Sequence, residues 1–165
     1  MRPITKIICI VGGFVAMAVF GAGLALAVSS SGSGRVGAFD SAAAYGEQDL
    51  VCTSSSAYVD MPSMTVTFTT HGPPNPAIVL FQGEWHVSGS AIAALRLVID
   101  NVVQTGPGDN NSPFAAHSGS RFETNGFNFI SNILRSGSHT AKIQWATRSA
   151  GQACVNERTM IVLHR

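Results

Sequence analysis

The chain has 165 residues, of which 12% are charged and 45% are hydrophobic, and its formal net charge at pH 7 is +1. This length suffices for a leader and one domain, but not for two ordinary domains. The low and balanced charge excludes the basic surface that is typical of nucleic-acid binding, so no nucleic-acid partner is expected.

The first residues follow the pattern of an exported protein. A basic head with Arg2 and Lys6 precedes an uncharged hydrophobic run over 7–28. That run is longer than the ~7–15 residues of a signal-peptide core and can span a bilayer as a helix of about 20 residues. An Ala-Leu-Ala triplet at 25–27 suits signal peptidase. Residues 1–28 are therefore a cleaved signal peptide or an uncleaved anchor, with 7–28 as the only membrane contact. Both alternatives place the remaining chain outside the cytoplasm, because the basic head stays inside.

Composition divides the rest of the chain into a linker and a domain. Residues 29–47 are rich in Ser, Gly and Ala, which is typical of a flexible linker. Residues 48–165 carry short apolar runs broken by turn residues, and no window has helical spacing long enough to predict a helix. We expect one all-β domain, preceded by a hydrophobic leader helix.

The cysteines agree with an oxidising compartment. If Cys9 belongs to the leader, Cys52 and Cys154 remain as an even pair. They are predicted to form a disulfide between the first part of the domain and its last strand. The alternative is a pair of reactive thiols or a metal site with histidines. No short Cys-x-x-Cys or Cys/His spacing supports a metal site, so neither a metal nor a cofactor is expected.

In several runs, apolar and polar residues alternate with the period of two that a half-buried strand requires. The clearest covers 139–147, where Ala141, Ile143 and Trp145 share one face and are assigned to the core. In the run 64–70, Met, Val and Phe alternate with threonines, and 95–99 follows the same pattern. The last strand is expected over 154–164.

Other segments are assigned from turn residues and continuous apolar runs. Residues 77–81 are apolar throughout, which predicts a central strand buried on both faces, and Gly83 is expected to mark a bulge. Asp and Asn at 100–101 predict a two-residue hairpin, and Asn and Gly at 125–126 predict a turn. The polar stretch 105–120 is expected to be a long loop.

Two motifs near the C-terminal end carry a resemblance. They are Leu134-x-x-Gly137-x-His139-Thr140-x-x-Ile143-x-Trp145 and Asn156-x-Arg158-Thr159-x-Ile161-Val162-Leu163. Together with the strand, Asp-Asn turn and strand of 96–103, they resemble small extracellular bacterial jelly-roll domains. These domains are similar in architecture to the trimeric heads of the C1q and tumour-necrosis-factor type. The resemblance implies an antiparallel, jelly-roll-like β-sandwich and provides no binding residue.

Candidate binding residues fall in two places. Trp85 is expected to be an exposed aromatic residue that stacks on a ligand. Asp109, Asn110 and Asn111 offer oxygen ligands of the kind that calcium accepts, although they lack the spacing of a dedicated site and also suit a solvated turn. His139 follows a polar turn, and its ring is expected to bond a neighbouring carbonyl or hydroxyl rather than to transfer protons or bind a metal.

No Gly-x-Ser-x-Gly nucleophile elbow stands at a strand end, and no catalytic residue is assigned. We therefore expect a secreted or membrane-tethered extracytoplasmic module. It would be non-catalytic and would bind a cell-surface or extracellular ligand, or associate with itself. The alternatives are a small secreted hydrolase with an unrecognised site and a coat or appendage subunit. An enzyme should gather two groups with opposed pKa shifts in one pocket, whereas a self-associating protein should present a flat apolar sheet face.

Overall fold

The computed structural model describes residues 28–36, 39–47, 49–104, 113–115 and 122–165. The expected leader lies outside this part of the chain except for Val28, and so does most of the expected loop over 105–120, including Asp109, Asn110 and Asn111. Within the described ranges, no helix has the length and hydrophobicity needed to cross a membrane.

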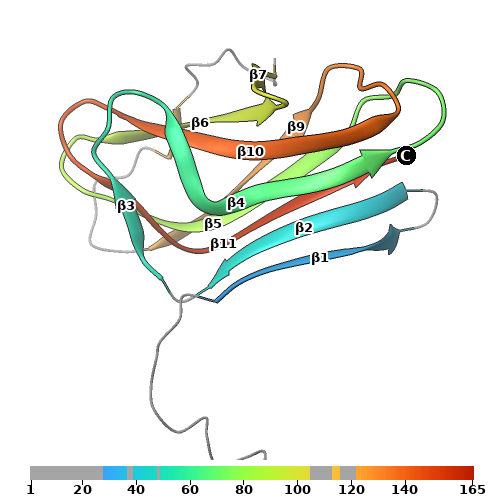
Figure 1. The fold of residues 1–165 in the computed structure, drawn as a ribbon. Coiled ribbons are helices and arrows are strands. Elements are labelled where there is room, and N and C mark those ends of the chain that lie inside the picture. Colours follow the sequence, from blue (N-terminus) through green and yellow to red (C-terminus); the bar gives the residue numbers. More distant parts are fainter. Residues whose placement is uncertain (1–27, 37–38, 48, 105–112, 116–121) are drawn as a thin grey trace, which may run out of the picture.

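In the described residues, eleven strands form two sheets that pack face to face (Figure 1). The β11 sheet has the order β1 (Val28–Val36), β2 (Phe39–Glu47), β11 (Ala153–His164), β5 (Ile78–Val87) and β9 (Glu123–Ile130), and β3 (Val51–Thr53) pairs with β11. The β10 sheet has the order β4 (Val59–Thr70), β10 (Gly137–Arg148), β6 (Ile92–Ile99) and β7 (Val102–Val103), and β8 (Pro113–Ala115) pairs with β6. Every pairing is antiparallel. The predicted all-β antiparallel sandwich is confirmed.

The core lies between the sheets, where the side chains that point inward from each strand meet. Ala141, Ile143 and Trp145 are 0%, 0% and 2% exposed, so the predicted alternation of this strand is confirmed. The Trp145 ring meets the Trp85 ring edge to face, with centroids 6.0 Å apart. Because β10 and β5 belong to opposite sheets, this aromatic pair joins the two layers at the centre of the core.

One predicted turn is confirmed and another is wrong. Asp100 and Asn101 have φ angles of 51° and 65°, the left-handed values that a two-residue hairpin requires at both positions. Asn125 and Gly126 instead lie inside β9, because the partner strand β5 continues past them and supplies ladder partners. The register irregularity expected at Gly83 falls on the opposite strand, between Val155 and Arg158 of β11.

The segment 29–47 forms strands, where the sequence predicted a flexible linker. β1 pairs with β2 along its length, and β2 pairs with β11 from Asp40 to Gly46. Ala42 and Ala44 are 5% and 3% exposed, so these small side chains contribute to the core. Composition alone indicated a linker because alanine is weakly apolar. The ladder to β11, which lies more than a hundred residues along the chain, supplies the hydrogen bonds that order the segment.

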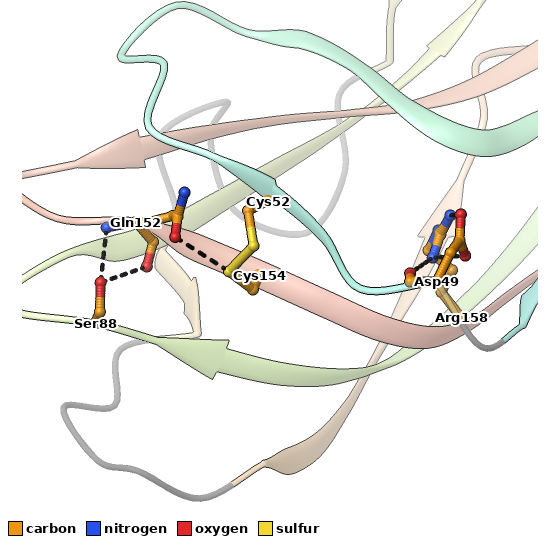
Figure 2. The surroundings of a disulfide bond; sticks show 6 residues. All are labelled: Asp49, Cys52, Ser88, Gln152, Cys154 and Arg158. Atoms are coloured by element: carbon orange, nitrogen blue, oxygen red, sulfur yellow. Dashed lines mark hydrogen bonds and ion pairs between the residues drawn. A yellow bond between two sulfur atoms is a disulfide. The ribbon is translucent and has the colours of Figure 1, made fainter. Parts of the chain in front are cut away.

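The predicted disulfide between Cys52 and Cys154 is present (Figure 2). These cysteines are directly opposed residues of β3 and β11. Nearby, the buried guanidinium of Arg158 pairs with Asp49, with Nη1 3.1 Å from Oδ1. The chain between β2 and β4 is therefore attached to β11 at two points.

Candidate binding groove and the histidine cluster at its end

A groove runs between β4 and the β1–β2 hairpin, where strands of opposite sheets lie side by side (Figure 1). It consists of two hollows of about 450 and 550 Å³ that share Ser33, Ala42 and Thr67. Val66 and Phe68 belong to its lining and to the core beneath. Five hydroxyl side chains also line it, namely Ser33, Ser41, Thr65, Thr67 and Thr69. We call this feature the hydroxyl groove.

The hydroxyl groove follows from the short side chains of β1 and β2. β1 reads Val-Ser-Ser-Ser-Gly-Ser-Gly-Arg-Val, and β2 carries three consecutive alanines over 42–44. A Cβ atom on Gly32 would meet no atom within 4 Å. These small residues leave open the space that larger side chains would fill between the hairpin and β4.

Two histidines and an aspartate lie at one end of the hydroxyl groove. His71, His164 and Asp40 belong to the lining of its larger hollow. His164 is only 6% exposed, and its Nδ1 atom accepts or donates no hydrogen bond within the described part of the chain. Burial lowers the pKa of His164 below its ordinary value, with Asp40 opposing the shift and His71 reinforcing it. The neutral ring is therefore the favoured form of His164 near pH 7, because a buried Nδ1 without a hydrogen-bond partner disfavours the charged ring.

His139 lies near this end of the groove and connects two turns by hydrogen bonds to Asp100 and Arg135, which we call the latch. Its Nδ1 atom is 2.6 Å from Oδ2 of Asp100, and its Nε2 atom is 2.8 Å from the carbonyl oxygen of Arg135. The Phe68 ring packs between His139 and His164, with centroid distances of 5.6 and 5.0 Å. The prediction that His139 bonds a neighbouring carbonyl is confirmed.

The latch stabilises the fold in a defined pH range. Burial disfavours the charged His139 ring, but its hydrogen bonds to Asp100 and Arg135 outweigh burial and raise its pKa above 6.5. The protonated His139 ring therefore adds to the free energy of unfolding. Its contribution is complete below pH 6.5 and is lost as the pH rises through the folded-state pKa of His139. Burial also opposes the charge of Asp100, yet His139 and the Thr140 amide hold the pKa of Asp100 below 3.8. That contribution is present above pH 3.8 and is lost as the pH falls, so the latch is strongest between these two values.

Asp100, His139 and Thr70 have the connectivity of a nucleophile triad, with Nε2 of His139 3.2 Å from Oγ1 of Thr70. A general base would have to accept the hydroxyl proton at Nε2. Here Nε2 faces the Arg135 carbonyl, which only accepts hydrogen bonds, so Nε2 carries a proton. The Thr70 hydroxyl is buried and donates to the same carbonyl at 2.6 Å. This geometry holds a turn in place and does not activate the hydroxyl.

The sequence-predicted site residues do not belong to the hydroxyl groove. Trp85 is 2% exposed and lies in the core, so its expected role as an exposed stacking residue is contradicted. The reason is parity, because Trp85 shares the inward face of β5 with Val79 and Phe81. Asp109, Asn110 and Asn111 lie outside the described residues. Among the residues that the structure describes, no three His, Cys, Asp or Glu side chains are placed to hold a metal ion.

No known protein family and no curated protein matches this sequence. Among solved structures, a chain of dimeric latent PorU from Porphyromonas gingivalis is similar, with a TM-score of 0.41 and 7% sequence identity. The match covers 82% of this chain and 14% of the PorU chain. A likeness this slight bears on neither the activity nor the partners of the present protein.

Proposed function

We propose that this protein is a non-catalytic extracytoplasmic module, secreted or held at the membrane by its N-terminal segment, that binds an extracellular ligand in the hydroxyl groove. The N-terminal export pattern and the disulfide between Cys52 and Cys154 support this location, because disulfides persist mainly in oxidising compartments. We further propose that the sandwich is a jelly roll. In support, β11 lies between β2 and β5, while β10 lies between β4 and β6 in the other sheet.

The observation that carries the proposal is the chemistry of the groove lining. Hydroxyl groups donate and accept hydrogen bonds, and the Asp40 carboxylate accepts them. A polyhydroxylated ligand needs donors and acceptors in this mixture. A hollow of about 550 Å³ lies within the usual range for small-ligand sites. We therefore propose a neutral glycan as the ligand class.

A glycan and cell-wall polymer screen on the exported protein, followed by calorimetry, tests this proposal. Thr67→Val removes a hydroxyl from the groove with little change in shape, so it should weaken binding about tenfold, as expected for one lost hydrogen bond. The matched control is Thr124→Val, which changes an exposed threonine on β9, outside the groove. Equal affinities for the two variants, or no binding to any polymer, would refute the proposal.

A small secreted hydrolase is the second candidate, and one observation favours it. This is the chain of contacts through Asp100, His139 and Thr70. Its test is turnover of ester and glycoside substrates by the wild type and by Thr70→Val. We expect no turnover, because Nε2 of His139 is engaged by the Arg135 carbonyl. Turnover that disappears in Thr70→Val would establish the hydrolase instead.

A further inference from the structure

The outer face of the β11 sheet carries large aliphatic side chains on three neighbouring strands. They are Ile78 and Leu80 on β5, Ile161 and Leu163 on β11, and Ile130 on β9. Their neighbours in sequence, such as Val79 and Met160, are fully buried in the core, so strand alternation places these five on the opposite face. The ladders align Leu163, Ile78 and Ile130 in one row and Ile161 with Leu80 in the next. We call these five residues the aliphatic patch.

The opposite outer face of the sandwich has a different composition. On the β10 sheet, the outward positions are mostly polar, and they include Thr65, Thr67, Thr69, Ser138, Thr140, Lys142 and Gln144. An antiparallel sheet with one face in water shows this alternation, whereas strands that are apolar on both faces are typical of sheets covered on both sides. The parts of β5 and β11 that carry the patch therefore have the composition of covered strands, whereas the next outward residues, Gln82 and Thr159, are polar. Within the described ranges, their main contacts run to sheet neighbours and across the core, and no labelled strand of Figure 1 lies over the patch.

We propose that a second copy of this chain covers the aliphatic patch, so that the protein is a dimer through face-to-face packing of two β11 sheets. The outer face of β2, β11, β5 and β9, four strands about 4.8 Å apart and about nine residues long, has an area of about 600 Å², close to the ~800 Å² per partner of a standard interface, and the aliphatic patch is its apolar part. The patch and the hydroxyl groove have no residue in common, so this proposal does not depend on the proposed function.

Charge around the patch supports a second copy and selects the symmetry axis. The patch rows contain no charged residue. Glu84 lies four residues beyond Leu80 on the outward side of β5. Arg165 lies four residues beyond Ile161 in the opposite direction, directly after the end of β11. The Arg165 guanidinium sits 4.6 Å from the centroid of the Phe39 ring. Consider a two-fold axis that lies in the interface, perpendicular to the strands and level with the row of Leu80 and Ile161. This axis brings Glu84 of one copy over Arg165 of the other. An axis along the strands would place the two Glu84 side chains opposite each other, which is repulsive.

The test is sedimentation velocity on the exported protein, across a dilution series. We expect a concentration-dependent dimer. Leu80→Glu should weaken it at least tenfold, because the new carboxylate would be buried between two aliphatic faces. Ile130→Glu should weaken it in the same direction. Since Ile130 is 59% exposed, this second variant should fold normally. Ser138→Glu, which places the same charge on the exposed outer face of the β10 sheet, is the matched control and should dimerise like the wild type.

The symmetry axis has its own test in a charge exchange. Glu84→Arg and Arg165→Glu should each weaken the dimer, and the double variant should restore it. A wild type that is monomeric at about 0.1 mM, or a dimer unaffected by both Leu80→Glu and Ile130→Glu, would overturn the proposal. So would a monomer that co-sediments with phosphatidylcholine vesicles through Leu80, since a lipid surface would then be the partner. Glycan binding in the hydroxyl groove is measured separately, so failure here leaves that result standing.

Discussion

Removal of the disulfide between Cys52 and Cys154 should cause a large loss of stability. The bond connects residues 102 positions apart, and it attaches the three-residue strand β3 to β11. Its loss therefore returns considerable freedom to the unfolded chain.

The magnitude follows from the loop length. In the chain-entropy description, closing a loop of about 100 residues stabilises the folded state by about 4.7 kcal/mol at 25 °C. A domain of this size loses about 4 °C of melting temperature for each kcal/mol of unfolding free energy, so the expected decrease is about 15–20 °C. Alanine is the appropriate replacement, because Cys154 is buried and a serine hydroxyl there would need a partner.

The assay is thermal unfolding, followed by circular dichroism, of the wild type and of the double variant Cys52→Ala/Cys154→Ala. Reduction of the wild type by a thiol reagent should reproduce the result of the double variant. Ser54→Ala, an exposed neighbour of β3, is the control and should melt like the wild type. A decrease of less than about 4 °C, which corresponds to about 1 kcal/mol, would refute the loop-closure reasoning.

Three further substitutions test local features of the fold, each by urea unfolding. His139→Gln should reduce the unfolding free energy by about 1 kcal/mol near pH 5 and by much less near pH 9, because only the charged ring forms the full latch; equal losses would contradict this account. Gly46→Ala should cost about 2 kcal/mol, since its Cβ would lie 2.6 Å from Cζ of the buried Arg158, whereas Gly32→Ala in open space should be nearly neutral. Asn101→Val should cost about 1–2 kcal/mol, because a β-branched residue disfavours the φ angle of 65° in this hairpin, and an unchanged midpoint would show that the turn relaxes.

The difference between the two outer faces has a structural consequence. A polar outer face on the β10 sheet allows that sheet to remain in water, while the aliphatic patch on the β11 sheet favours association. The hydroxyl groove opens between the sheets at β4, whose threonines also belong to the polar outer face, and it shares no residue with the aliphatic patch. A dimer formed through the patch would therefore present two grooves at once, and a polymeric glycan that reached both would bind with increased avidity.

Strands with a buried face could be predicted because their signal is local. The alternation around Trp145 and the Asp100-Asn101 pair depend only on side-chain parity and on the φ angles those residues tolerate. The disulfide followed from cysteine number and compartment. Trp85 was predicted wrongly because a bulge was expected at Gly83; the bulge lies in β11 instead, so the alternation of β5 continues unbroken to Trp85 and points it inward.

The hydroxyl groove could not be predicted, because its lining comes from three distant parts of the chain. β1 and β2 supply one wall, β4 supplies the other, and His164 from β11 lies at the end. Each contributing segment is unremarkable when taken alone. The Ser, Gly and Ala residues of 29–47 even indicated a linker, because composition does not show which strand will pair with them.

The sequence by itself determined the class of fold, the parity of its clearest strands and the pair of cysteines that are joined, because these depend on periodicity, local backbone preference and residue count. The tertiary structure alone decided which outward residues become neighbours. Strand pairing brings Ile161 beside Leu80, and packing of the two sheets places Thr67 and Ala42 in the lining of one hollow. The aliphatic patch arises from long-range strand pairing and the hydroxyl groove from the packing of two sheets, since both bring together side chains that the chain itself keeps far apart.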